Sequence, residues 1–370
     1  KDVAVNYKAL LRLFGLIGAV MSIGLFVVAP SWPTPDKLFV FFLFVFLALG
    51  QSWQFIKKFA PFVLMILAYE SFRGLVPQLN GRVEYQWMID VDKWLGGGQL
   101  PTAWLQDQLY FGSAAWYDFV LYLVYMLHFV LPFALAIAIW KTRTVLYWRY
   151  VWTFVGLSFM GFVTFLLFPA APPWLAAEEG LIEPITRISS DVWWALGIQD
   201  FPSVYGKISP NPVAAVPSLH AAYATLFSLF LFKLYDRKWG AISVLYPAAI
   251  YFGTVYQGEH YIIDELLGGL YAVVAFVLFG KLFGYLRKRR DRHADRDARA
   301  QAIVSSDKLG VSFSLKACHE YSVNWKKCLQ STYDLGFQRF RLMTYWDMYE
   351  IRQGDYDFTS LDEQLKVIRR

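Results

Sequence analysis

The feature that most constrains this chain is a succession of long apolar blocks, which fill most of its first 285 residues. An apolar stretch of about 20 residues matches the thickness of a bilayer, where the backbone polar groups must be satisfied inside a helix. Only 17% of the residues are charged, against roughly a quarter in a soluble domain. We therefore predict an all-α polytopic membrane protein with about eight transmembrane helices, at residues 9–30, 38–55, 59–79, 114–140, 150–169, 217–235, 239–258 and 261–284.

Basic residues gather at alternate ends of the predicted spans, which indicates how the chain is oriented. They lie at Lys8 and Arg12, Lys57 and Lys58, Lys141 to Arg149, Lys233 to Lys238, and Arg287 to Arg292. An even number of spans puts these clusters on one side, and the positive-inside rule makes that side the cytoplasm, together with both termini. Because the clusters are short and lie between spans, the net charge of +6 does not indicate a nucleic-acid partner.

Two long segments between spans, about 80–113 and 170–216, fall on the opposite, extracytoplasmic face. They are long enough to cover a site at that face. The second contains Trp193 and Trp194 in an amphipathic stretch, a pattern typical of an anchor at the membrane interface.

Two short motifs, also on that face, carry polar groups with catalytic potential. Residues 217–221 read Pro-Ser-Leu-His-Ala, and residues 258–264 read Gly-Glu-His-Tyr-Ile-Ile-Asp. In the first, Ser218 is a candidate N-cap of an apolar helix, where free N–H groups attract anions, and His220 follows it. In the second, His260 and Asp264 lie four residues apart and share one face of a helix.

These residue types suit phosphoryl transfer through a phosphohistidine. Asp264 can hold the tautomer of His260, whose other ring nitrogen can then attack phosphorus. His220 can protonate the leaving oxygen, and Ser218 can bind phosphate. The alternatives are a structural His260–Asp264 ion pair that closes a helix end, and a capping serine followed by an incidental histidine.

Two further polar residues lie within predicted spans. Arg73 is suited to gripping phosphate, but it can also form an ion pair with Glu70, which shares its helix face. His128 lies in the middle of the fourth span, where a hydrogen-bonded core histidine is the commoner role. Since no carboxylate cluster or His/Cys ligand set is visible, we expect neither a metal nor another cofactor.

The two motifs resemble the type 2 phosphatidic acid phosphatase superfamily, whose signature includes Pro-Ser-Gly-His and a later histidine with an aspartate four residues on. The resemblance implies that His260 is the nucleophile, His220 the leaving-group acid and Asp264 the group that supports the nucleophile. It also implies that Ser218 binds phosphate. The chain departs from the pattern at Leu219, which replaces the glycine, and at Thr254, which replaces a phosphate-binding arginine.

With these departures, the sequence resembles more closely the branch of inositolphosphotransferases that includes fungal inositol phosphorylceramide synthase. Its members show Pro-Ser-Leu-His-Ala, a His-Tyr-x-x-Asp block and a Pro-Pro-Trp loop, which is found here at residues 172–174. The resemblance covers roughly residues 60–285. If the chain belongs to this branch, we expect Arg73 to bind phosphate in place of the arginine that is missing at position 254.

The composition changes after residue 286, and we divide the chain there. Residues 1–286 form the membrane domain, 287–308 a charged linker, and 309–370 a soluble α/β segment with strands at 311–315 and 337–343 around a helix at 324–335. This segment resembles the opening of a glycoside hydrolase (β/α) barrel. It holds about two of the eight units that a barrel needs, so the segment is expected to be truncated.

The sequence thus predicts an integral membrane phosphotransferase that acts on a phospholipid or polyprenyl phosphate through a phosphohistidine, with a polyol as a possible acceptor. One alternative is a lipid phosphate or polyprenyl-diphosphate phosphatase. Another is a non-catalytic protein that binds lipid phosphates and anchors a glycosidase-like domain to the membrane.

Overall fold

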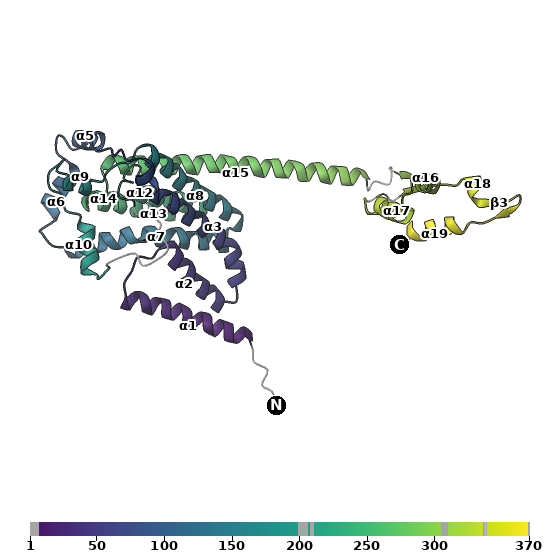
Figure 1. Ribbon diagram of the computed structural model, residues 1–370, viewed down its shortest axis with the longest axis horizontal. Helices are drawn as coiled ribbons and strands as arrows, with labels where there is room; N and C mark the ends of the chain where they lie inside the picture. The colour runs from purple at the N-terminus through teal and green to yellow at the C-terminus, as the bar shows by residue number, and fades with distance from the viewer. Residues whose placement is uncertain are drawn as a thin grey trace, which may run out of the picture. The chain divides into compact units, whose positions relative to one another are not determined.

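The computed structural model describes residues 7–198, 206–207, 211–304, 310–335, 337 and 339–368 (Figure 1). The chain divides into two compact units, Lys1–Lys281 and Leu282–Arg370. The first unit is a bundle of apolar helices, and the second is a small α/β unit. Helix α15, Ile262–Val304, begins in the first unit and ends in the second.

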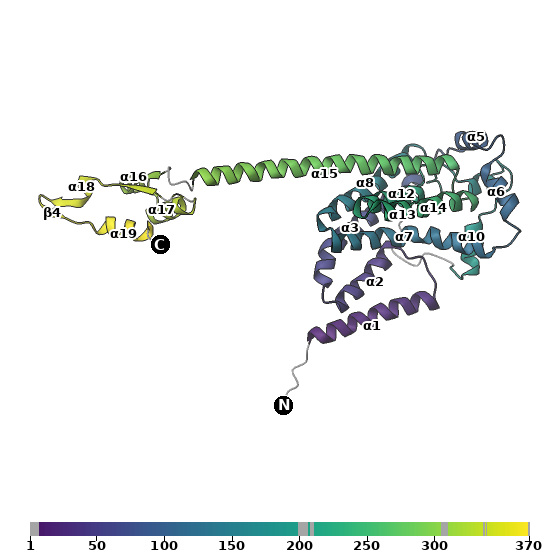
Figure 2. The ribbon, with the colours of Figure 1, turned by 180° about the vertical axis from the view of Figure 1, so that it is seen from behind.

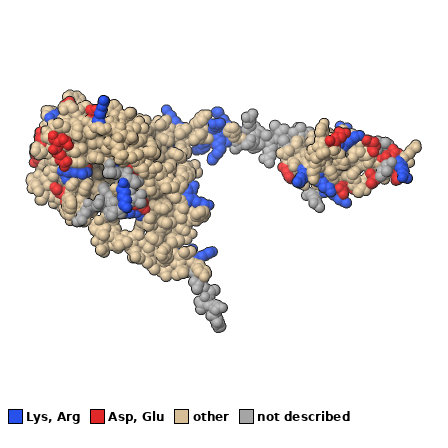
Figure 3. Space-filling view, in the orientation of Figure 1, with Lys and Arg blue, Asp and Glu red and all other residues tan. Residues whose placement is uncertain are grey.

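Within the described residues, five helical stretches are long and apolar enough to cross a membrane. They are Tyr7–Val28 (α1), Ser52–Leu79 (α3, Ser52–Gly74, with α4, Val76–Leu79), Trp116–Thr142 (α7), Thr144–Leu167 (α8) and Ile262–His293 in α15. Figure 3 shows few charged side chains on the visible surface of this bundle, as expected where lipid is the neighbour. The chain is thus a helical membrane protein.

The other three expected spans are shorter helices. They are α2 (Pro35–Ala48), α12 (Leu219–Leu234) and the pair α13 (Arg237–Ser243) and α14 (Leu245–Tyr256). The span predicted at 239–258 is divided into two helices, because the ring of Pro247 would clash with the carbonyl of Ser243, where α13 ends. That carbonyl instead accepts a hydrogen bond from Ser228 Oγ at 2.8 Å.

The boundary between the second and third predicted spans also differs from the expectation. Helix α2 ends at Ala48 and α3 begins at Ser52, although the apolar pattern placed this break at 55–59. Gly50 makes the turn with a φ of +71°, a backbone conformation that residues other than glycine rarely adopt. The aromatic residues that follow are therefore helical, and Phe55, Phe59 and Phe62 form one fully buried face of α3.

Two connecting segments, residues 80–115 and 168–198, lie beside the start of α15 (Figure 2). The first contains α5 (Gln86–Leu95) and α6 (Pro101–Leu109), and the second contains α9 (Pro173–Glu178) and α10 (Ile188–Ala195). Parallel bridges join Glu84 to Ala170 and Ala170 to Ala214. The two segments share a small apolar core with Tyr261, which is fully buried.

The two tryptophans of the second connecting segment behave differently. Trp194 is 67% exposed, as an interfacial anchor would be. Trp193 instead packs edge-on against Trp32, with ring centroids 4.9 Å apart. The amphipathic pattern alone did not reveal this inward contact.

In the second unit, strands β1 (Gly310–Ser314) and β2 (Arg339–Met343) pair in parallel. Between them lie α16 (Leu315–Glu320) and α17 (Trp325–Asp334), and Asn324 caps α17 through the Lys327 amide at 3.1 Å. The chain continues through α18 (Trp346–Tyr349), the hairpin β3–β4 (Glu350–Arg352 and Asp355–Tyr356) and α19 (Thr359–Ile368). The expected strand, helix and strand are present, and the order fits one β/α unit followed by a second strand.

The first unit depends on a close crossing of α12 and α15. The Ser218 amide donates to the carbonyl of Asp264 at 3.0 Å, which joins the starts of the two helices. A Cβ atom built on Gly268 would lie 2.2 Å from the carbonyl oxygen of Ser218. Only glycine allows this approach, as is common where membrane helices touch.

Replacing Gly268 with alanine should therefore force the two helices apart. We expect a loss of about 1–3 kcal/mol in unfolding free energy, as for other overpacked sites, and reduced activity. Thermal unfolding in detergent measures the first effect. Gly24→Ala is the matched control, because no atom of the described residues lies within 4 Å of its Cβ position. Equal melting temperatures for the two variants would contradict this account of the crossing.

Candidate active site

The structure brings the two sequence motifs together. His220 lies in the first turn of α12, and His260 lies in the turn between α14 and α15. Nδ1 of His220 is 3.1 Å from Nε2 of His260, although forty residues separate them. Behind them, Oδ2 of Asp264 lies 3.4 Å from Nδ1 of His260. His260 is 5% exposed and Asp264 is fully buried, so the three groups interact in a site largely shielded from water.

This geometry favours one arrangement of protons. Asp264 can accept the Nδ1 proton of His260, which leaves the Nε2 lone pair directed toward His220. The 3.4 Å contact is long for a hydrogen bond, but catalytic hydrogen bonds often tighten only when substrate binds. Burial lowers the pKa of His260, but the hydrogen bond to Asp264 and the charges of nearby carboxylates outweigh it, so the pKa is raised.

Ser218 occupies the N-cap of α12. Its Oγ accepts a hydrogen bond from the Ala221 amide at 3.2 Å, and its side chain is fully buried. The capping role expected from the sequence is therefore present, two residues before His220.

Arg73 lies near the end of α3, with its Nε 2.8 Å from Oε2 of Glu70. The ion pair with Glu70, which was the alternative role for Arg73, is therefore present. The guanidinium is also close enough to act electrostatically on His220. A phosphate bound at the histidines would therefore lie within reach of its field.

Thr254 explains one departure from the phosphatase pattern. Its Oγ1 donates to Oε1 of Glu265 at 2.7 Å, and both residues are buried. An arginine at this position would need much more room than threonine. The structure therefore has a buried threonine–glutamate pair where the phosphatases carry a cation.

The turn that carries His260 is held from one side by the second connecting segment. The Trp174 amide donates to the carbonyl of Gly258 at 3.1 Å. Gly258 has a φ of +79°, and a Cβ there would lie 3.1 Å from the Thr186 carbonyl oxygen. Gln106 closes the contact by donating to the carbonyls of Thr186 and Tyr256, at 2.8 and 2.9 Å.

Glu259, the residue before His260, is the centre of an ion-pair network. Nε and one terminal nitrogen of Arg187 donate to its two carboxylate oxygens at 2.9 and 3.1 Å, and Ser189 Oγ donates to it as well. The guanidinium of Arg187 also lies 4.4 Å from the ring centroid of Trp174 and 4.8 Å from that of Trp193. No local pattern indicates this network, because Arg187 and Ser189 lie 72 and 70 residues before Glu259 in the sequence.

Asp92 holds the other side of the turn. Its two carboxylate oxygens accept the amides of Ile262 and Ile263 at 2.8 and 3.1 Å, which caps the start of α15. The side chain is fully buried, and burial raises its pKa to about 6 despite the two backbone hydrogen bonds. A cap that comes from 170 residues away leaves no local sequence signal.

In the part of the chain that the structure describes, no group of three or more histidine, cysteine or acidic residues is arranged to hold a metal ion.

Comparison with known proteins identifies the family of the chain. A family model described as the PAP2 superfamily matches residues 86–278, just over half of the chain. The chain belongs to the PAP2 superfamily. The predicted resemblance to the type 2 phosphatidic acid phosphatases is confirmed, and the matched region contains both histidine motifs.

Three relatives indicate to which branch of the superfamily the chain is similar. A phosphoinositol dihydroceramide synthase of Bacteroides thetaiotaomicron is 34% identical over 141 residues, which are 36% of this chain and 45% of that protein. An inositol phosphorylceramide synthase of Candida albicans is 28% identical over 187 residues, or 47% of this chain and 38% of that protein. The catalytic subunit of the Saccharomyces cerevisiae synthase is 26% identical over 187 residues, or 47% and 44%.

These similarities support the predicted inositolphosphotransferase-like branch of the superfamily. The chain spans less than half the length of each of these relatives. No solved structure matches the chain.

The Arg187–Glu259 pair should show strong coupling. In Arg187→Gln, the carboxylate of Glu259 loses its cation while its side chain is only 8% exposed. We expect a loss of about 1–3 kcal/mol, because an unpaired buried charge costs more than the pair contributes. The double variant Arg187→Gln/Glu259→Gln should recover most of it. Unfolding in detergent measures the cycle, and strictly additive losses would argue against the network.

Asp92→Asn should change how stability depends on pH. The folded-state pKa of Asp92, about 6, is above its usual value of 3.8, so ionisation opposes folding. The wild type should therefore lose stability relative to the variant as the pH rises from about 4 to about 7. The measurement is the difference in melting temperature between the two proteins at each pH. A difference that stays constant over this range would contradict the assignment.

Proposed function

We propose that this protein is a lipid phosphotransferase that works through a phosphohistidine. The observation that carries the proposal is the 3.1 Å contact between the two imidazoles, with the Asp264 carboxylate behind the second ring. Nε2 of His260 attacks phosphorus as the bond to the leaving lipid alkoxide breaks. His220, as an imidazolium, gives that alkoxide a proton. Asp264 stabilises the positive charge on His260.

The second half of the reaction reverses the proton movement. An acceptor hydroxyl gives its proton to His220 and attacks phosphorus, which breaks the bond to His260 and restores both rings. Arg73 and the start of α12, including Ser218, stabilise the charge on the equatorial oxygens. This step distinguishes a transferase from a phosphatase, since water takes the place of the alcohol in the latter.

The relatives suggest the substrate class. Their names specify the synthesis of phosphoinositol dihydroceramide and of inositol phosphorylceramide. We propose the same class of reaction here, with an inositol phospholipid as donor and a sphingoid hydroxyl as acceptor. The departures at Leu219 and Thr254 from the phosphatase pattern support this choice over simple hydrolysis.

We also propose the orientation and the role of the C-terminal segment. The histidines face the extracytoplasmic side, and both termini lie in the cytoplasm, as the distribution of basic residues indicates. Residues 309–370 are proposed to be the opening of a (β/α) barrel, which the parallel pairing of β1 and β2 supports.

The test is transfer of labelled phosphoinositol from phosphatidylinositol to dihydroceramide in mixed micelles. His260→Ala should lower the rate at least about 1,000-fold and abolish the acid-labile phosphoenzyme, because the nucleophile is lost. His319→Ala, an exposed histidine of the second unit, is the control and should be fully active.

Each other outcome supports a different reading. Label released only to water would favour the phosphatase. Lipid binding without a phosphoenzyme, unchanged in His260→Ala, would favour the non-catalytic anchor.

A further inference from the structure

A third histidine lies against the proposed site, and the proposed transfer gives it no role. His128 of α7 has its ring centroid 4.4 Å from that of His220, at an interplanar angle of 41°. Tyr125, one turn earlier on α7, stacks on His220 with centroids 4.6 Å apart and an angle of 26°. One face of α7 thus fixes the ring plane of His220.

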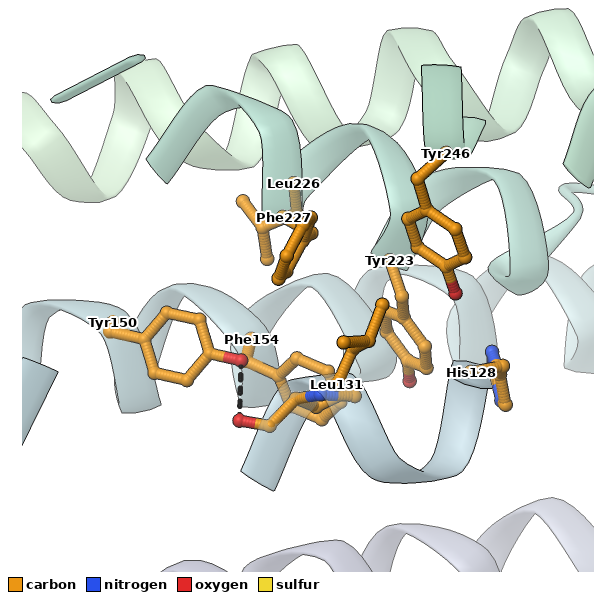
Figure 4. A pocket seen from close by; sticks show the side chains of 9 residues that line it. His128, Leu131, Tyr150, Phe154, Tyr223, Leu226, Phe227 and Tyr246 are labelled. Carbon is orange, nitrogen blue, oxygen red and sulfur yellow. Dashed lines mark hydrogen bonds between the residues drawn. The ribbon is translucent and has the colours of Figure 1, made fainter. Parts of the chain in front are cut away.

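Behind His128 lies a small cavity of about 10 Å³, shown in Figure 4. Helices α7, α8, α12 and α14 enclose it, and its lining includes His128, Tyr150, Phe154, Tyr223 and Tyr246. This volume is enough for about one water molecule. In Figure 4 the hydroxyl of Tyr246 is directed toward the imidazole of His128.

The polar atoms of this cavity suit a bound water. Nδ1 of His128 is buried and has no hydrogen-bond partner among the described residues. The hydroxyl of Tyr223 forms a hydrogen bond with Oγ of Ser158 at 2.5 Å. A buried ring nitrogen without a partner destabilises the folded protein, and a water between it and a tyrosine hydroxyl removes that cost. Phenylalanine would satisfy the packing alone, so the polarity of His128 requires another explanation.

We propose that His128, together with one water molecule in this cavity, is a positioning residue that stabilises the protonated form of His220. The inference rests on the proposed function, in which His220 alternates between imidazolium and neutral imidazole. The imidazolium forms near the positive charge of Arg73, which opposes it, and a protonated His128 would oppose it as well. His128 therefore acts in its neutral form. A neutral imidazole and a rotatable water supply dipoles that offset this repulsion, and His128 itself gains and loses no proton.

Several titratable groups lie around His220 and its two neighbouring rings. Arg73 on α3, His128 on α7 and His260 before α15 act on His220 itself, and Tyr125 on α7 stacks on it. Glu259, Asp264 and Glu265 act on His260, and Tyr150, Tyr223 and Tyr246 line the cavity beside His128. The experiment therefore changes the cavity while leaving the partners of the two reacting rings in place.

The experiment measures kcat for phosphoinositol transfer, from phosphatidylinositol to dihydroceramide in mixed micelles, as a function of pH. His128→Phe keeps the ring contact and removes the nitrogen. We expect kcat to fall about tenfold with KM little changed, and the alkaline limb of the profile to move to lower pH, because His220 loses its proton more easily.

Three further variants separate polarity from packing. His128→Gln, which keeps a polar group, should restore most of kcat and the position of the limb. Tyr246→Phe, which removes one hydroxyl from the cavity, should shift the limb in the same direction as His128→Phe. Leu131→Val changes the apolar wall of the cavity and should leave the profile unchanged.

The outcomes are distinguishable from failure of the proposed function. A His128→Phe protein with wild-type kcat and an unmoved alkaline limb overturns the inference, provided that His260→Ala is inactive. An active His260→Ala would instead overturn the proposed function. If His128→Phe does not fold, Tyr246→Phe decides: a shifted limb supports the inference, and an unmoved limb overturns it.

Discussion

The backbone contact between the starts of α12 and α15 is the interaction on which the rest of the site depends. The Ser218 amide donates to the Asp264 carbonyl at 3.0 Å, and Gly268 makes the approach possible. Two helix N-termini therefore meet at one place, and each brings the positive end of its dipole. The Asp92 carboxylate already accepts the first amides of α15. A phosphate fits such a place electrostatically, and the histidines at the same two helix starts are positioned to react with it.

The connecting segments give this junction its rigidity. Asp92 holds the residues after His260, while Arg187 and Trp174 hold those before it. An imidazole that must attack in line with a leaving group tolerates little misplacement, so fixing the turn on both sides favours catalysis. The same segments bury the histidines, and charges interact more strongly where water is excluded.

The aromatic surroundings of His220 serve the same end from within the bundle. Tyr125 and His128 share one face of α7 and contact the ring of His220. Arg73 supplies a nearby positive charge that suits a phosphate but opposes an imidazolium. The proposed role of His128 reconciles these two demands, because a neutral dipole can stabilise a cation without repelling the anion.

The sequence by itself determined the helical membrane class, the two motifs and the superfamily, because helical periodicity and hydropathy are local properties. The spacing of His260 and Asp264 is one such property, and so is the cap at Ser218. Only the tertiary structure decided the ion pair of Arg187 with Glu259, the cap from Asp92 and the contact of His128 with His220. Each of the three contacts joins groups at least 72 residues apart, and such pairs meet only through packing of whole helices, which no local pattern encodes.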